Sequence, residues 1–259
     1  GYTSISEATF TASDWNESMW DLSGKLPVFK GYVLVEDLTA QGAKATLEFA
    51  NDGAQALASQ LSSNGLTGEI AEIRALDGTV LSTDGTITLT ADLRTKLLGT
   101  AKSGDATIVV KVTDGSKSYT YKLKITFVTK YIATAADLAA MEAMGADSSS
   151  SNYLTGLYVL TADIDYANAG FCINYFGGTF EGQGHTISNI KVKDAMGGGL
   201  FVNVNANGVI RNVAFVNLVN DLPMTGDWIR RNLLAFVFQG TIENVYVSGS
   251  RKNIEGNYC

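Results

Sequence analysis

Three carboxylates, Asp163, Asp165 and Glu181, are the side chains with the clearest capacity for chemistry in this sequence. Asp163 and Asp165 are separated by one residue, so on a β-strand both side chains would point to the same face. Such a pair could bind calcium, or it could act with Glu181 in a paired-carboxylate mechanism. Calcium takes about six to eight oxygen ligands, however, and the pair supplies only two side chains. A structural role for Asp163 and Asp165 is therefore favoured over a metal site or a catalytic one.

Further partners for catalysis have weaker support. Lys191, Lys193 or Arg211 could serve as the cation of a polysaccharide lyase. His185, the single histidine, could act as a general base, but no Ser or Cys stands at a spacing from it that would indicate a nucleophile. Within Gly-Gln-Gly-His it is expected to hydrogen-bond a turn. We expect no catalytic residue and no cofactor, and one His with two Cys offers too few ligands for zinc.

Tryptophan residues offer a second kind of chemistry, the stacking of aromatic rings on a ligand. Trp228 lies with Arg230 and Arg231 in a segment that we interpret as a surface loop. Loops on a rigid scaffold often carry binding, so these three are the predicted ligand-binding residues. Trp15 and Trp20 could form a similar platform, although burial in a packed tail is favoured for large aromatic side chains.

The composition limits the class of protein. The chain has 259 residues, 46% of them hydrophobic and 17% charged, which suffices for a core in one large domain or two ordinary ones. A net charge of −7 without a long basic run argues against nucleic-acid binding. No apolar stretch approaches the roughly 20 residues that cross a bilayer, so insertion into a membrane is not expected. Cys172 and Cys259 are interpreted as a buried thiol and a chain end, with a disulfide between them as the alternative.

The first half of the chain indicates a tail at residues 1–30 and a β-domain at 31–129. Apolar and polar residues alternate at 107–112 and at 119–127, on either side of an Asp-Gly-Ser turn, which predicts a hairpin. About six or seven strands in roughly 100 residues is typical of an immunoglobulin-like β-sandwich, with another small antiparallel sheet as the alternative. The other strands are expected near 31–38, 43–49, 69–76 and 79–89, and short helices at 53–61 and 90–99, the second capped by Thr90 with Asp92 in its first turn.

Residues 130–259 have a different character. Thr134 and Asp137 form a pair like a capping box, so a short helix is expected to begin there and to stop at Gly145. Its apolar face would carry Leu138, Met141 and Met144. After it, short apolar runs bounded by Gly or Asn predict strand after strand.

An internal repeat is the most informative pattern in this half. Ile-x-Asn-(Val/Ile)-x-apolar occurs three times, with its asparagines at Asn189, Asn212 and Asn244 and spacings of 23 and 32 residues. Stacked coils of a β-helix would place Ile and Val in an apolar column and Asn at corners, where it tolerates a left-handed backbone. The longer third repeat fits a loop insertion around 220–231. A structural row of asparagines is favoured over the alternative of a ligand-binding row.

Three stretches carry a resemblance to known proteins. Residues 158–165, Tyr-Val-Leu-Thr-Ala-Asp-Ile-Asp, resemble a Y-x-L-x-x-D-I-D opening, and residues 178–187, Gly-Thr-Phe-Glu-Gly-Gln-Gly-His-Thr-Ile, resemble a G-T-F-x-G-x-G-H-T-I coil. Gly199-Leu200-Phe201 with the later Ile210-x-Asn212-Val213 is similar to a G-L-F and I-x-N-(L/V) repeat. This is the pattern of bacterial GLUG-motif surface proteins and adhesins, a group that includes regions accompanying IgA-cleaving proteases.

The resemblance covers residues 131–250, about half the chain, and implies a right-handed β-helix that acts as a stalk or adhesive module. It also implies that residues 10–30 are the closing segment of a preceding β-helix. The chain departs from the family because it stops at Cys259 after a few coils, without a capping segment.

Together these observations predict an all-β protein, with an immunoglobulin-like β-sandwich at 31–129 and the start of a truncated right-handed β-helix with a short capping helix at 130–259. The expected function is non-enzymatic adhesion or display on the bacterial cell surface, with a host glycan or extracellular protein as partner. A carbohydrate-active enzyme and a pure structural spacer are the alternatives.

Overall fold

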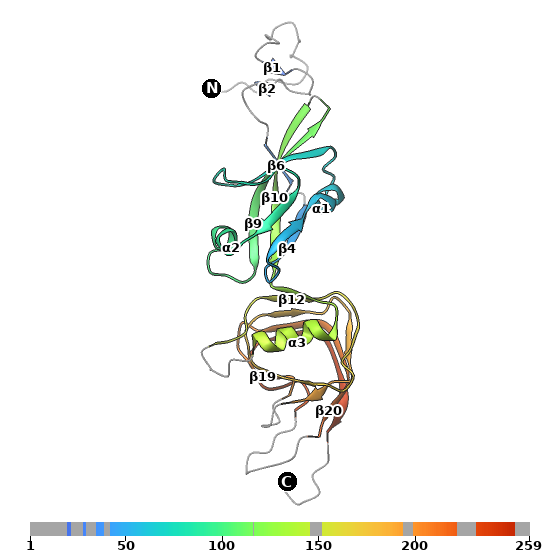
Figure 1. The fold of residues 1–259 in the computed structure, drawn as a ribbon. Coiled ribbons are helices and arrows are strands. Elements are labelled where there is room, and N and C mark those ends of the chain that lie inside the picture. Colours follow the sequence, from blue (N-terminus) through green and yellow to red (C-terminus); the bar gives the residue numbers. More distant parts are fainter. Residues whose placement is uncertain are drawn as a thin grey trace, which may run out of the picture. The chain divides into compact units, whose positions relative to one another are not determined.

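The computed structural model describes residues 20–21, 28–29, 35–38, 42–115, 117–145, 152–193, 199–221 and 232–251 (Figure 1). Most of these residues lie in β-strands and several sheets are parallel, which confirms the all-β class expected from the sequence. Within the described ranges, no helix has both the length and the apolar character to cross a lipid bilayer.

Contacts within the chain divide it into two compact units, and each is described by itself. The first consists of Gly1–Ala45, Ala54–Thr88 and Ala106–Ile125. The second consists of Thr46–Gly53, Leu89–Asp105 and Thr126–Cys259. Two short segments that precede residue 106 therefore belong with the C-terminal half of the chain.

A six-stranded sheet dominates the first half of the chain, with the order β3-β10-β9-β6-β7 and with β4 also paired to β10. β6 pairs antiparallel with β7 and β9, whereas β3 pairs parallel with β10. Two small sheets join β1 to β2 and β5 to β8. The strands are β1 (Trp20–Asp21), β2 (Val28–Phe29), β3 (Val35–Asp37), β4 (Lys44–Glu48), β5 (Gly53–Ala56), β6 (Glu69–Ala75), β7 (Val80–Ser82), β8 (Thr86–Leu89), β9 (Gly104–Asp114) and β10 (Lys117–Val128).

The predicted alternation along the last two of these strands is present. β9 buries Ile108, Val110 and Val112 completely, because every second side chain of a strand faces the same side. β10 buries Leu123 and Ile125 in the same way. The two strands are neighbours in the sheet, as the expected hairpin requires.

Two short helices occur in the first half of the chain, α1 (Ala58–Ser63) in the first unit and α2 (Ala91–Leu98) in the second. α2 agrees with the sequence, because the Thr90 side chain accepts a hydrogen bond from the Leu93 N–H at 3.2 Å. α1 corrects the expected helix at 53–61, since the first four residues of that range form β5 instead. Gly53, with a φ of +111°, cannot continue a helix, and pairing with β8 satisfies the backbone groups that follow it.

Parallel strands build the second unit from Lys130 onward. Every strand pair recorded between β11 and β22 is parallel, and successive passes of the chain pair with one another, as in β11-β12-β16-β20-β22 and β15-β19-β21. The strands are β11 (Lys130–Ile132), β12 (Leu157–Leu160), β13 (Ile164–Asp165), β14 (Gly170–Phe171), β15 (Ile173–Phe176), β16 (Thr179–Glu181), β17 (Thr186–Ser188), β18 (Lys191–Val192), β19 (Phe201–Val204), β20 (Val209–Asn220), β21 (Ala235–Phe238) and β22 (Thr241–Arg251). We call residues 130–251 the parallel stack.

The core of the parallel stack is aromatic. Phe201 is completely buried, and four other phenylalanine rings lie within 6.4 Å of its centroid. These rings come from four different strands: Phe171 from β14, Phe176 from β15, Phe180 from β16 and Phe215 from β20. In register each of these rings is paired with an aliphatic side chain, as Phe201 is with Ile173 and Phe180 with Ile210, and the burial of both kinds stabilises the stack.

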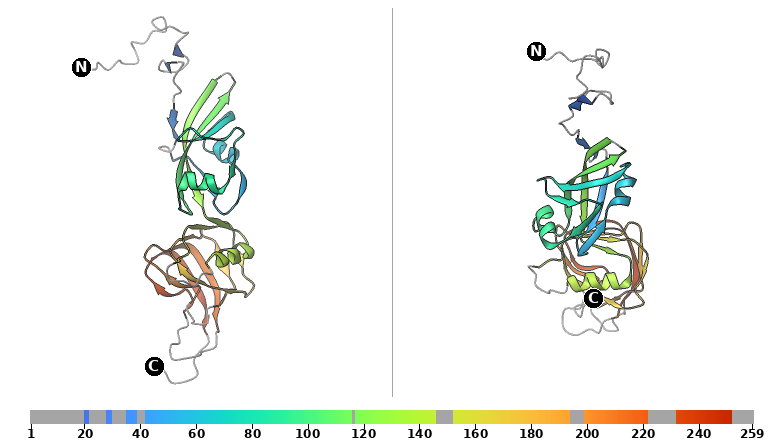
Figure 2. Two further views of the ribbon diagram at one scale, coloured as in Figure 1. Left: turned by 60° about the vertical axis from the view of Figure 1, so that its left-hand side comes forward. Right: turned by 45° about the horizontal axis from the view of Figure 1, so that its top comes forward.

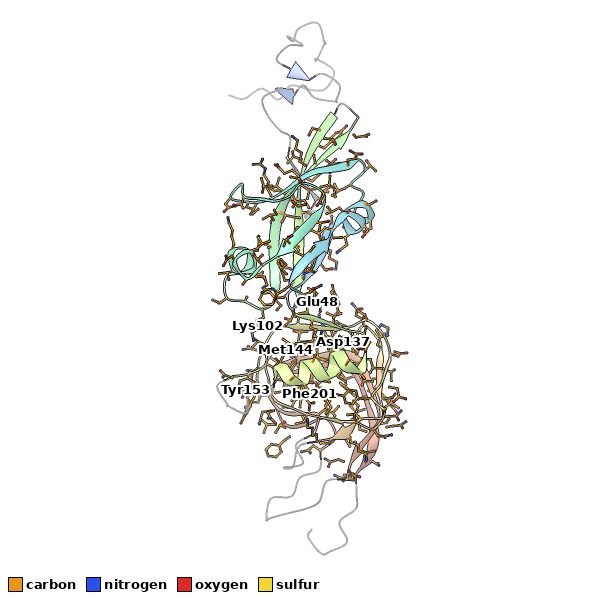
Figure 3. All side chains as sticks on the ribbon, in the orientation of Figure 1. Glu48, Lys102, Asp137, Met144, Tyr153 and Phe201 are labelled. Carbon is orange, nitrogen blue, oxygen red and sulfur yellow. The ribbon has the colours of Figure 1, made fainter. Side chains whose placement is uncertain are left out.

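Helix α3 (Ala135–Met144) lies at one end of the parallel stack (Figures 1 and 2). Leu138 and Met141 join the buried core of the stack, and the helix ends at Gly145 as expected. Met144 differs from its prediction, because 41% of its surface is exposed (Figure 3). The buried face of α3 is thus shorter than the apolar pattern indicates.

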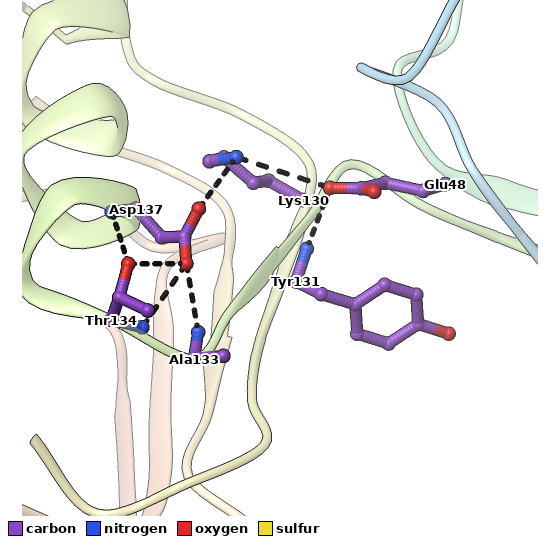
Figure 4. A network of polar contacts seen from close by, with 6 residues as sticks. All are labelled: Glu48, Lys130, Tyr131, Ala133, Thr134 and Asp137. Atoms are coloured by element: carbon purple, nitrogen blue, oxygen red, sulfur yellow. Dashed lines mark hydrogen bonds and ion pairs between the residues drawn. The ribbon is translucent and has the colours of Figure 1, made fainter. Parts of the chain in front are cut away.

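The start of α3 is tied to its surroundings by the Asp137 carboxylate (Figure 4). Asp137 accepts hydrogen bonds from the N–H and hydroxyl groups of Thr134, and Thr134 in turn caps the Asp137 N–H, which confirms the predicted capping box. Lys130 Nζ lies 3.3 Å from Asp137 and 4.0 Å from Glu48, a residue of β4 that also accepts from the Tyr131 N–H. The hydroxyl of Thr134, with lesser help from the Ala133 N–H and Lys130, lowers the pKa of Asp137 despite the opposing effect of burial.

Candidate functional site

Two rows of hydrogen-bonded side chains run across the parallel strands and contain the three asparagines of the sequence repeat and two of the candidate carboxylates. The first row begins at Asp165, whose Oδ1 accepts from Asn189 Nδ2 at 2.9 Å. Asn189 Oδ1 then accepts from Asn217 Nδ2 at 3.2 Å. We call these three residues the first amide row.

The second amide row has the same design. Asn212 Nδ2 donates to both carboxylate oxygens of Glu181, at 3.0 and 3.3 Å. Asn212 Oδ1 accepts from Asn244 Nδ2 at 3.1 Å. Each row therefore starts at a carboxylate, which can only accept hydrogen bonds. Each asparagine then donates its Nδ2 to the preceding residue of the row, and its Oδ1 can accept from the next asparagine.

The asparagines of both rows occupy left-handed backbone positions. Their φ angles are +57° for Asn189, +53° for Asn212, +56° for Asn217 and +51° for Asn244. Asparagine tolerates this region better than other non-glycine residues, so it can turn the chain and bridge the passes at once. The asparagines that the sequence repeat singles out thus lie at turns of the chain and hydrogen-bond to neighbouring passes, and their structural role stays a prediction.

The three asparagines of the sequence repeat do not all belong to the same row. Asn212 and Asn244 share the second row, but Asn189 pairs with Asn217 in the first. In register, Phe180 stands over Ile210 and Ile242, whereas Ile187 stands over Phe215 and Val247. The first copy of the Ile-x-Asn pattern thus marks a different corner from the other two. Asn217 was missed because Val-Asn-Leu lacks the leading isoleucine of that pattern.

The three candidate carboxylates have separate partners. Asp163 Oδ1 accepts from the Thr186 N–H at 2.8 Å and lies 3.2 Å from His185 Nδ1, and these contacts lower the pKa of Asp163. In Asp165 the Asn189 amide, followed by the Ala167 N–H, lowers the carboxyl pKa. The backbone N–H of His185 donates to the Gly182 carbonyl and closes a turn, whereas the His185 ring contacts the Asp163 carboxylate.

Glu181 is the most enclosed of these carboxylates, with 14% of its side chain exposed. Burial raises its pKa, but hydrogen bonds from the Gln183 N–H and Asn212 together with Arg211 outweigh burial, so the net shift is downward. Arg211 Nε lies 2.6 Å from Glu181 Oε2. Of the proposed lyase cations, Arg211 thus pairs with Glu181, and Lys193 lies 3.3 Å from Glu142 on α3. No group of three or more His, Cys, Asp and Glu residues suited to a metal ion occurs in the described part of the chain.

An open depression of about 700 Å³ lies beside the second amide row. The turn at Gln183 and Gly184 borders it, and Asn212, Ala214, Asn244 and Tyr246 contribute to its lining. We call this depression the amide groove. The described residues that line it include no charged side chain.

Most of the remaining candidate residues from the sequence analysis lie outside the part of the chain that the structure describes. The ligand-binding candidates Trp228, Arg230 and Arg231 lie outside the described residues, as do Trp15 and Cys259. Only the backbone of Trp20 is described, in β1, where it pairs with Phe29. Cys172 is half-buried, and its Sγ lies 3.8 Å from Asn174 Oδ1.

Comparisons of this chain with protein-family models, with curated proteins and with solved structures find no match. The strands and their pairing define a mostly β protein with a stack of parallel strands.

Proposed function

We propose that this chain is a non-enzymatic module for adhesion or display on the outside of a bacterial cell. In this proposal, residues 31–129 are an immunoglobulin-like β-sandwich, and residues 130–259 are the first coils of a right-handed β-helix with α3 at one end. The parallel register of Phe180, Ile210 and Ile242 supports the β-helix, because successive coils stack equivalent positions in that architecture.

The observation that carries the non-enzymatic proposal is the engagement of all three candidate carboxylates. Asp165 and Glu181 each start an amide row, and Asp163 is held by a backbone N–H and His185. The two catalytic carboxylates of a glycosidase must instead flank the bond that is cleaved in a single substrate. The downward pKa shifts of the three groups also favour ionised hydrogen-bond acceptors over a general acid near neutral pH.

A stacked scaffold of this kind suits contact with an external partner. Repeated coils present a long lateral surface, and insertions between them project as loops. A host glycan or an extracellular protein is the proposed class of partner, and the segment around 220–231 is a proposed contact region.

Binding of the intact chain to an array of glycans and extracellular-matrix proteins tests the proposal. The expected result is saturable binding that Trp228→Ala weakens and that Tyr119→Ala, a change at an exposed residue of β10, leaves unchanged. A blank array overturns adhesion in favour of a spacer. Turnover of a polysaccharide that a folded Asp163→Asn/Asp165→Asn variant no longer supports would establish the enzyme instead.

A further inference from the structure

The amide groove has a rigid wall formed by the turn at Gln183 and Gly184. The Gly184 N–H donates to the Asn212 carbonyl at 2.7 Å, and the Gln183 N–H donates to Glu181 Oε1 at 2.8 Å. Gly182 lets the turn pack closely against β20, because a Cβ at residue 182 would lie 2.4 Å from Val213 Cβ and would clash with it. The wall is therefore held in place before any ligand arrives, which reduces the entropy cost of binding.

The floor of the groove combines amides with one exposed aromatic ring. Asn212 and Asn244 are joined by the second amide row, and 61% of the Tyr246 surface is exposed. Ala214 stands opposite Tyr246 in the parallel register of β20 and β22. The small side chain of Ala214 leaves space beside the tyrosine ring, where a flat ligand could lie against it.

The electrostatics of the groove favour an uncharged ligand. Glu181 supports the wall, but its charge is balanced by Arg211 at 2.6 Å and by the Asn212 amide. Asn244 and Gln183 supply neutral donors and acceptors. An anionic or cationic ligand would find no opposite charge among the described residues that line the groove.

The parallel pairing of β20 and β22 favours an extended ligand. Parallel strands repeat at about 4.8 Å, so the positions of Asn212 and Asn244 recur along the stack at that interval. Hydroxyl groups along such a ligand can bond to the side-chain amides of Gln183 and Asn244, and the apolar face of a sugar ring can stack on Tyr246. The openness and mixed polarity of the lining are a poor match for a lipid tail, which needs an enclosed apolar pocket.

The geometry points to the amide groove as a binding site for a neutral glycan, with Tyr246 as the stacking residue and Gln183 and Asn244 as hydrogen-bonding residues. This inference rests on the proposed adhesive function and specifies the ligand class for a defined site. It differs from the contact proposed around 220–231, because the groove is built from β20, β22 and the turn after β16.

Two variants of the intact chain test the groove. Tyr246→Ala removes the ring, and Ala214→Trp fills the space beside it, while Tyr119→Ala is the matched control at an exposed tyrosine of β10. The probe is an array of immobilised neutral hexose and N-acetylhexosamine oligosaccharides, printed beside sialylated and sulfated counterparts and extracellular-matrix proteins. Circular dichroism and thermal melting verify that each variant is folded.

The expected result is binding to neutral oligosaccharides that both groove variants weaken at least about tenfold and the control does not. Binding to neutral oligosaccharides that neither folded variant changes overturns the groove and leaves adhesion standing. Binding confined to charged glycans or to proteins does the same. Absence of all binding overturns both proposals, and a groove variant that fails to fold is judged by the other.

Discussion

Asn244 donates its side-chain amide to Asn212 Oδ1 at 3.1 Å, and both residues turn the chain with left-handed φ angles above +50°. The same side chain therefore performs two tasks, because it permits the corner and bridges one pass of the chain to the next. Glu181 starts this row and Asp165 starts the other, so both carboxylates accept hydrogen bonds from asparagine side chains.

Substitution of Asn212 separates these two tasks. Asn212→Gly removes the amide bonds to Glu181 and Asn244 but accepts the φ of +53° without strain, so we expect a loss of about 2 kcal/mol in the free energy of unfolding. Asn212→Ala loses the same bonds and adds about 1 kcal/mol of backbone strain. Urea denaturation measures both, with the exposed loop residue Asn207 changed to Gly and Ala as the control. Equal stability of Asn212→Ala and Asn212→Gly would contradict the role of the left-handed backbone.

The capping box of α3 predicts a local effect of Asp137. Asp137→Ala removes the acceptor of the Thr134 N–H and hydroxyl groups and leaves Lys130 without this partner, so we expect a loss of about 1 kcal/mol. The control is Asp92→Ala in the first turn of α2, where Thr90 alone provides the side-chain cap. Chemical denaturation should show the larger loss for Asp137→Ala. Indistinguishable losses would mean that the box adds nothing beyond ordinary helix electrostatics.

The aromatic core predicts a large effect of Phe201. Phe201→Ala would leave a cavity among Phe171, Phe176, Phe180 and Phe215, and we expect a loss of about 3 to 5 kcal/mol. Phe236→Ala is the matched control, since 37% of that residue is already exposed. Thermal melting and denaturant titration should show a clearly smaller change for Phe236→Ala. A loss below about 1 kcal/mol for Phe201→Ala would show that the rings do not form a close-packed core.

Sequence reasoning succeeded where the signal is local. Thr134 and Asp137 lie three residues apart, so the capping box can be recognised without knowing what α3 packs against. Alternation in β9 and β10 is equally local, because each strand carries its own pattern of burial.

The sequence alone could not predict which asparagines share an amide row, and the reason is physical. Asn189 and Asn212 stand in the same local pattern, and only the pairing of distant strands assigns them to different corners. The amide groove was missed as well, since Gln183, Ala214 and Tyr246 meet only when three passes of the chain are stacked. The predicted roles of Trp228, Arg230 and Arg231 remain predictions, because these residues lie outside the described ranges.

The acidic anchors predict a specific pH dependence of stability. Asp165 has a lowered pKa in the folded chain, first because Asn189 donates to it and second because of the Ala167 N–H. A carboxyl with a lowered folded pKa stabilises the fold above its unfolded pKa, and this contribution is lost as the pH falls through the folded value. Acid should therefore weaken the fold below about pH 4, the ordinary range of an aspartate. Asp163 and Glu181 have shifts of the same sign and should add to the effect.

Asp165→Asn tests this dependence, because the amide keeps an oxygen that can accept from Asn189 but has no charge to lose. Its free energy of unfolding should fall less steeply than that of the wild-type chain between about pH 4 and pH 2. Urea denaturation at a series of pH values gives the two slopes, and Asp92→Asn, which removes an exposed carboxylate from α2, is the charge-matched control. A slope for Asp165→Asn that equals those of the control and the wild-type chain would show that the Asp165–Asn189 bond does not link ionisation to folding, and that the first row is held by its amides alone.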